Sequence, residues 1–173
     1  GLGSGSSRFI SGSRPIHKVL ESNLSNWLDQ DSVLLFPSGY QANIAAIQAL
    51  ADKNTIIIAD KLIHNSLLVG SKASGAKLIR FLHNNLKDLE NKLLKYSINN
   101  NSILVVVESL YSMEGSIAPL ENITKLCKKY NCKLLVDEAH ALGILGPRGK
   151  GLSNPFLDSI NIVSGTFGKA FGS

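Results

Sequence analysis

Short apolar runs alternate with longer, mixed stretches along most of this chain. Five runs rich in Ile, Val and Leu are almost continuously hydrophobic, as strands buried on both faces of a sheet are. They are Thr55–Ala59, Lys77–Leu82, Ile103–Glu108, Lys133–Asp137 and Ile160–Ser164. Their length and composition predict strands.

The stretches between these runs predict helices. One apolar face repeats at positions 86, 89, 93 and 94, with Asn84 or Asn85 available as the N-cap. A second repeats at positions 120, 123, 126 and 130 and places Pro119 in a first turn. The segments 40–50 and 64–74 are less periodic, but they lack proline and contain many helix formers. The alternation predicts one α/β domain over residues 1–173, with a mostly parallel sheet flanked by helices.

Composition and charge narrow the class of partner. No apolar run approaches the ~20 residues that span a bilayer. The net charge is +5, but the lysines are scattered, and the tightest pair, Lys128–Lys129, lies near the end of a predicted helix, where it favours the helix dipole. We therefore expect neither a membrane nor a nucleic-acid partner. Cys127 and Cys132 lack the further ligands of a zinc site, so we expect no metal and two buried thiols in a reducing cytoplasm.

Titratable and hydroxyl side chains gather directly after four of the predicted strands. They are His64, Glu108, Ser112, Asp137, His140, Thr166 and Lys169. In a parallel sheet the loops beyond the carboxyl ends of the strands carry the functional site. Taken singly, His64 reads as a capping or core histidine, Asp137 as a helix cap and Lys169 as a surface lysine in a turn. Their occurrence together favours an active site.

These side chains match the needs of a pyridoxal-phosphate site. Lys169 lies among small residues and offers an amine for a Schiff base. Asp137 can supply the carboxylate beside the pyridine nitrogen, and the ring of His64 can stack on the cofactor.

The cofactor's phosphate needs backbone N–H donors at the start of a helix. The segment Ser38–Asn43 has this form, because a strand-like run, Val33–Phe36, leads through a turn at Gly39 into a predicted helix. Thr166 can add a hydroxyl.

Seven stretches, in the same order along the chain, resemble the α-oxoamine synthases, pyridoxal-phosphate enzymes of the fold-type I aminotransferase superfamily. They are Gly3–Arg8 with Gly12, His17 with Leu20–Glu21, Ser38–Asn43, Asp60–Ser66, Ser112–Gly115, Asp137–His140 and Thr166–Lys169. Together they cover essentially the whole chain. The resemblance implies the large, cofactor-binding domain of that superfamily.

The resemblance also implies a role for each site residue. Lys169 would hold the cofactor and later move protons, Asp137 would pair with the pyridinium nitrogen, and His140 would hydrogen-bond the phenolic oxygen. His64 would stack on the ring. The remaining cofactor contacts would come from Gly39, Tyr40 and Thr166 at the phosphate and from Ser112 and Glu108 beside the ring.

The family reaction condenses an amino acid with an acyl-CoA thioester and releases carbon dioxide and CoA. Within the family, Ser38–Asn43 and the segment 74–84 are most similar to the branch that uses L-alanine and a pimeloyl thioester in biotin synthesis. The family forms homodimers with the site at the interface. It also continues beyond both ends of this sequence, so we expect a fragment that lacks an N-terminal segment and a smaller C-terminal domain.

Other classes of protein share some of these features. Asp137–His140 also spells a helicase signature, but the required G-x-x-x-x-G-K-[ST] loop is absent upstream. A non-catalytic scaffold on the same fold would have lost the cofactor lysine, whereas Lys169 is present. Another α-oxoamine synthase, or another fold-type I enzyme such as an aminotransferase, stays open.

Overall fold

The computed structural model describes residues 5–98 and 102–172, and the chain divides into two compact units, with the boundary between Leu35 and Phe36. The first unit contains α1 (Arg8–Ser11) and α2 (Pro15–Leu28), which the sequence pattern did not predict. Proline suits the first position of α2 because its φ is already helical and no N–H is lost. Among the described residues, no helix has the length and apolar character needed to cross a membrane.

The second unit is built on a parallel sheet. Its strands, as far as the chain is described, lie in the order β2-β1-β3-β4-β5, and every pairing is parallel. They are β1 (Thr55–Asp60), β2 (Lys77–Phe81), β3 (Ser102–Glu108), β4 (Lys133–Asp137) and β5 (Ile162–Ser164). The predicted α/β class, parallel sheet and strand positions are confirmed, with bounds that differ by at most two residues.

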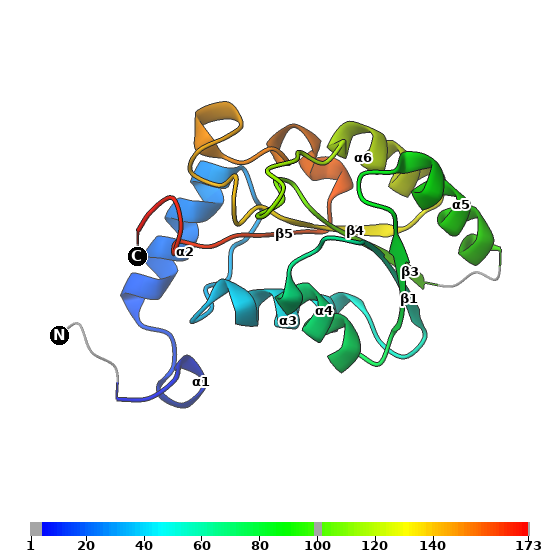
Figure 1. Cartoon of the computed structure of the whole chain (residues 1–173). Helices are drawn as coiled ribbons and strands as arrows, with labels where there is room; N and C mark the ends of the chain where they lie inside the picture. Colours follow the sequence, from blue (N-terminus) through cyan, green and yellow to red (C-terminus); the bar gives the residue numbers. More distant parts are fainter. Residues whose placement is uncertain (1–4, 99–101, 173) are drawn as a thin grey trace. The chain divides into compact units, whose positions relative to one another are not determined.

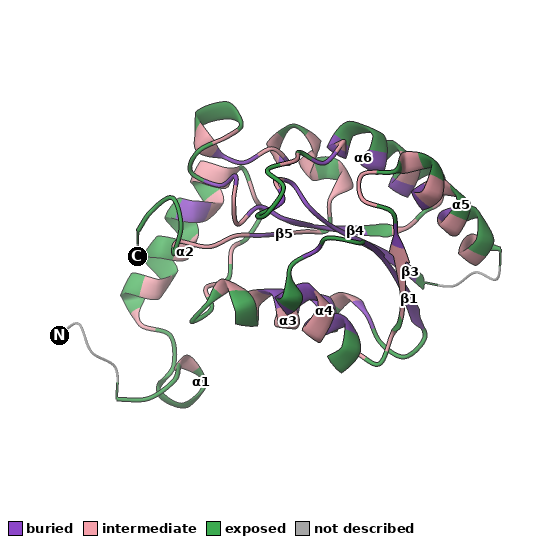
Figure 2. Ribbon diagram, viewed as in Figure 1, coloured by how far each residue is buried: buried purple, intermediate pink, exposed green. Residues whose placement is uncertain are grey.

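Helices cover both faces of this sheet, as Figure 1 shows. They are α3 (Gly39–Leu50), α4 (Asn65–Ala73), α5 (Leu86–Ser97) and α6 (Leu120–Lys129). Because successive strand residues point to opposite faces, β1 contributes Ile57 to the core under α3 and α4, and Ile56 and Ile58 to the core under α5 and α6. The central strands are therefore buried along most of their length (Figure 2).

The helix ends follow local capping chemistry. Asn85 is the N-cap of α5, and its side chain accepts a hydrogen bond from the backbone N–H of Asp88 at 2.9 Å. Of the two predicted caps, Asn85 is therefore the one that is used. Asn84 lies before the helix in a left-handed backbone conformation, with φ of 53°. Pro119 immediately precedes α6 instead of lying in its first turn.

Two further local expectations were wrong. Val33–Phe36 lies outside the strands of the described chain; its Leu35 N–H donates to the Glu21 carboxylate at 3.0 Å instead of to a neighbouring strand, and Leu34 is 64% exposed. An apolar run forms a strand only where a partner strand lies beside it. Cys127 is buried as expected, but Cys132 is only partly buried.

Candidate active site

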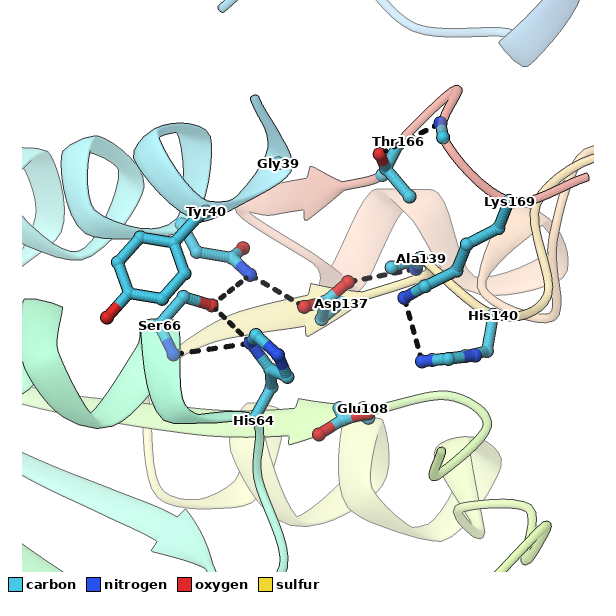
Figure 3. Close-up of a pocket in the computed structure, with 13 residues that line it drawn as sticks. Gly39, Tyr40, His64, Ser66, Glu108, Asp137, Ala139, His140, Thr166 and Lys169 are labelled. Atoms are coloured by element: carbon cyan, nitrogen blue, oxygen red, sulfur yellow. Dashed lines mark hydrogen bonds between the residues drawn. The ribbon is translucent and has the colours of Figure 1, made fainter. Parts of the chain in front are cut away.

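A pocket of about 170 Å³ lies in the second unit at the carboxyl ends of the strands (Figure 3). Eight of the predicted site residues line it: Gly39, Tyr40, His64, Glu108, Asp137, His140, Thr166 and Lys169. The lining also includes Asn43, Ser66, Ala139, Gly165 and Gly168, to which the sequence assigned no role. Parallel strands end at one edge, and this brings side chains from distant parts of the chain together.

Ser112 is the one predicted site residue that does not line this pocket. It is exposed and lies in the turn that follows β3. Its role beside a cofactor ring stays a prediction.

The floor of the pocket is set by strand register. Glu108 of β3 lies opposite Asp137 of β4, and Asp137 lies opposite Ser164 of β5. Asp137 is 4% exposed, and its carboxylate accepts hydrogen bonds from the Asn43 amide at 2.7 Å and from the Ala139 backbone N–H at 2.9 Å. A buried carboxylate needs such donors to replace water. Its position is therefore fixed from two directions.

Asn43 and Ser66 connect Asp137 to His64. The Asn43 amide also donates to the Ser66 hydroxyl at 2.9 Å, and that hydroxyl lies 2.7 Å from Nδ1 of His64. His64 is at the same time the N-cap of α4, since its Nδ1 accepts the Ser66 backbone N–H at 3.2 Å. These contacts, visible in Figure 3, orient the His64 ring at the edge of the pocket.

Lys169 and His140 form the pair that faces Asp137 across the pocket. The Lys169 Nζ lies 2.7 Å from Nε2 of His140 (Figure 3). Burial and the adjacent Lys169 charge lower the pKa of His140 below its usual value. The imidazole is therefore neutral near pH 7, so its Nε2 can accept a hydrogen bond from the lysine amine.

Glu108 has a different environment from its strand neighbour. It is 2% exposed, and burial together with the charge of Asp137 raises its pKa to about 7. Glu108 can therefore hold or release a proton near neutral pH. A carboxyl group of this kind in a pocket is typical of functional sites.

The start of α3 forms the end of the pocket near Thr166. A Cβ at Gly39 would lie 3.2 Å from the Cβ of Thr166, so any larger residue here requires the Thr166 side chain to shift. Ser38 caps the helix through a hydrogen bond from the Gln41 N–H at 3.2 Å. A helix N-terminus with its partial positive charge suits a phosphate group.

The donor set fits pyridoxal phosphate. An amine, a carboxylate, two imidazoles and a helix N-terminus surround one pocket. The amide oxygen of Asn43 is also buried and has no hydrogen-bond partner among the described residues. It can therefore accept a hydrogen bond from a bound molecule beside Asp137.

Glu138 follows Asp137 but faces away from this chemistry. It is fully buried, and its carboxylate accepts hydrogen bonds from the Ser109 hydroxyl at 2.6 Å and from the Ser153 backbone N–H at 2.5 Å. It therefore anchors the loop that carries His140.

Comparison with known proteins gives the class. The family model for aminotransferase class I and II matches residues 2–173, and the chain belongs to this family. Among curated relatives, it is 44% identical over 174 residues to a putative 8-amino-7-oxononanoate synthase of Acetivibrio thermocellus, covering 99% of this chain and 44% of the relative. It is 42% identical to 8-amino-7-oxononanoate synthase of Haemophilus ducreyi, covering 98% of this chain and 46% of the relative. The resemblance stated from the sequence is thus confirmed.

Solved structures agree on the fold. A serine palmitoyltransferase of Sphingomonas wittichii superimposes with a TM-score of 0.94 at 36% identity, covering 99% of this chain and 43% of its own. The 8-amino-7-oxononanoate synthase of Francisella tularensis gives 0.79 at 31% identity, covering 96% and 49%. A further serine palmitoyltransferase structure, with a TM-score of 0.92, 36% identity and coverage of 99% and 43%, is described as holding PLP as an internal aldimine. The chain therefore spans less than half the length of these relatives.

Proposed function

We propose that the full-length protein is a pyridoxal-phosphate-dependent acyltransferase of the α-oxoamine synthase type. The observation that carries the proposal is the pairing of Lys169 with the neutral imidazole of His140 opposite the buried carboxylate of Asp137. Relatives that are named 8-amino-7-oxononanoate synthase, and a structural relative that holds PLP, support it.

The pocket residues would divide the work of holding the cofactor. Lys169 would bind its aldehyde carbon, Asp137 its ring nitrogen, and the start of α3 with Thr166 its phosphate. His64 would lie against the ring, and His140 beside the phenolic oxygen. When bound, pyridoxal phosphate supplies a ring that withdraws electrons from the substrate's α-carbon.

The chain's own residues supply proton positions. The Lys169 amine can take or return a proton at the substrate's α-carbon, and its contact with the His140 Nε2 orients the amine in the pocket. Glu108, with a pKa near 7, offers a second proton-holding site beside Asp137. Both groups lie where a general acid or base must lie, within one pocket.

We propose L-alanine and a pimeloyl thioester as the substrates, in biotin synthesis. The curated relatives at 42–44% identity support this pair. The serine palmitoyltransferases at 36% identity favour the second candidate, another α-oxoamine synthase with a different amino acid and acyl chain. A homodimer with the site at its interface remains a prediction of the resemblance, and a cytoplasmic location remains a prediction from the two cysteines.

Reduction with borohydride tests the proposed role of Lys169. The full-length protein, incubated with pyridoxal phosphate and then reduced, should carry the cofactor irreversibly on the peptide that contains Lys169, because only a Schiff base is fixed in this way. Mass spectrometry of the digest identifies the peptide. Label on a different lysine, or no label, would contradict the assignment; Lys150 serves as the internal comparison because it is buried outside the pocket lining.

A further inference from the structure

A second hydrogen-bonded cluster lies at the carboxyl ends of β1 and β2, outside the pocket lining. Its centre is Asp60, the last residue of β1, which is fully buried. The carboxylate accepts hydrogen bonds from the Leu62 backbone N–H at 2.8 Å, from His83 Nδ1 at 3.0 Å and from the Asn84 backbone N–H at 2.9 Å. Because a carboxylate accepts, the His83 Nδ1 carries the hydrogen in this contact.

His83 extends the cluster to the loop that follows β3. Its Nε2 lies 2.8 Å from the Ser116 hydroxyl, and its ring packs edge-on against Tyr111 with 4.5 Å between ring centroids. Burial and the charge of Asp60 raise the pKa of Tyr111, which keeps its phenol neutral. The cluster therefore joins three loops at one edge of the sheet.

Ser116, His83 and Asp60 are hydrogen-bonded to one another in that order, as the serine, histidine and aspartate of nucleophilic hydrolases are. Ser116 does not line the pocket, however, and the contacts of Asp60 lead along the backbone towards the pocket instead. The geometry thus points to a positioning role.

The contacts of Asp60 fix the backbone immediately before His64. Its carboxylate holds the N–H of Leu62, and its carbonyl accepts the N–H of Ile63 at 3.4 Å and Nε of Arg80 at 3.2 Å. The Arg80 guanidinium also donates to the carbonyl of Lys61. Each residue between β1 and His64 is therefore hydrogen-bonded, and the contact to the Leu62 N–H is the one made by the Asp60 carboxylate itself.

We propose that His83 is a positioning residue for the cofactor pocket: through its N–H on the buried Asp60 carboxylate it fixes the segment that presents the His64 ring. The inference rests on the proposed function in one respect, namely that pyridoxal phosphate is the molecule that the His64 ring meets. His83 itself does not line the pocket.

Two substitutions separate the contacts of His83. In His83→Asn the amide nitrogen occupies the place of Nδ1 and keeps the donor to Asp60, while the contact with Ser116 is lost. In His83→Gln the longer amide reaches towards Ser116 and leaves Asp60 without this donor. Ile123→Ala, on the buried face of α6, controls for a general loss of stability.

The readouts are the dissociation constant for pyridoxal phosphate and the visible circular dichroism of the bound cofactor, both measured on the full-length protein. Circular dichroism reports the asymmetric contact of the ring with its surroundings, which a purely structural residue would not alter. His83→Gln should weaken binding about tenfold, the effect of one hydrogen bond to a charged group, and reduce the dichroism. His83→Asn and Ile123→Ala should keep the wild-type spectrum and bind within about twofold of wild type, because the donor to Asp60 is retained.

The outcomes distinguish this inference from the proposed function. If His83→Gln bound pyridoxal phosphate with the dissociation constant and the circular dichroism of the wild type, the inference would be overturned and the proposed function would stand. Equal damage in His83→Asn would overturn it as well, because the contact with Asp60 would then not be the one that matters. No binding of pyridoxal phosphate by the wild type would instead overturn the proposed function.

Discussion

Glu108 and Asp137 show how two carboxyl groups in adjacent strands acquire different properties. They are register partners at the ends of β3 and β4, and both are almost fully buried. Asp137 is held by two N–H donors, whereas burial beside the charge of Asp137 raises the pKa of Glu108. Environment, not residue type, therefore decides which group anchors and which exchanges a proton.

The raised pKa of Glu108 predicts how stability depends on pH. The native carboxyl binds its proton up to about pH 7, whereas the unfolded one releases it near its ordinary value of 4.5. Between these values the native state binds more protons, so the free energy of unfolding falls as pH rises from 4.5 to 7 and is level above. Glu108→Gln removes this loss and should stabilise the cofactor-free protein at pH 8 by on the order of 3 kcal/mol relative to wild type.

Urea unfolding at pH 5 and pH 8 measures the effect. The gain from Glu108→Gln should be small at pH 5 and appear at pH 8. Glu114→Gln removes an exposed carboxylate and controls for net charge. Equal stability differences at both pH values would show that Glu108 does not titrate in this window.

The residues that the sequence missed share a physical reason. Asn43 and Ser66 lie in or at the start of helices, where a small polar side chain predicts a solvent-facing position. Their value lies in partners that are remote in sequence: Asn43 bonds Ser66 and Asp137. Lys169 and Asp137, by contrast, have charged side chains, which packing in a core does not require. Their positions directly after predicted strands therefore already indicated a functional site.

At the scale of elements, the start of α3 depends on its approach to the turn after β5. Gly39 leaves room for Thr166, and this contact brings the helix N-terminus to the pocket. Gly39→Val should push the two apart and weaken the binding of pyridoxal phosphate at least tenfold, more than Gly39→Ala, because the neighbouring side chain can give way for a methyl group only.

Gln41→Val is the matched control for this prediction. It places the same branched side chain in the same helical turn, at an exposed position outside the pocket lining. Titration with pyridoxal phosphate should show near wild-type affinity. Equal losses in Gly39→Val and Gln41→Val would attribute the effect to helix propensity instead of to the contact with Thr166.

Elements differed in how well the sequence predicted them. The strands were clear because β1, β3 and β4 are buried on both faces and read as continuous apolar runs. The run Val33–Phe36 is equally apolar but has no partner strand among the described residues. Whether a run finds a partner depends on residues distant in the sequence, so a short stretch cannot predict it. The helix α2 was missed although its apolar positions 16, 19, 20, 24, 27 and 28 follow a helical period; in the structure half of them are exposed, and Leu24 is the one buried residue of this helix.

At the scale of the whole molecule, the chain accounts for less than half the length of its relatives. The described pocket offers the groups that a cofactor needs, whereas the choice of substrates stays a proposal. That the 173 residues form a single domain stays a prediction.

A CoA-release assay on the full-length protein tests the substrate proposal. Alanine, glycine and serine, each combined with short-chain, pimeloyl and long-chain acyl-CoA, form the grid. Turnover should be highest with alanine and pimeloyl-CoA, by at least about tenfold over the other pairs, since even one methylene in a fitted pocket changes specificity by that order. A maximum with serine and a long-chain acyl-CoA would select the second candidate function, and release without an amino acid would indicate simple hydrolysis.

The hydrogen bond from Asn43 to Asp137 joins residues that are 94 positions apart. Closing so long a loop costs chain entropy, and this cost is offset only by the contacts of the completed sheet. Contacts of this kind therefore form late in folding. The pocket would then be the last part of this unit to mature, after β1, β3 and β4 have paired. A nascent chain would have no complete place for its cofactor until the segment containing Lys169 had also emerged from the ribosome.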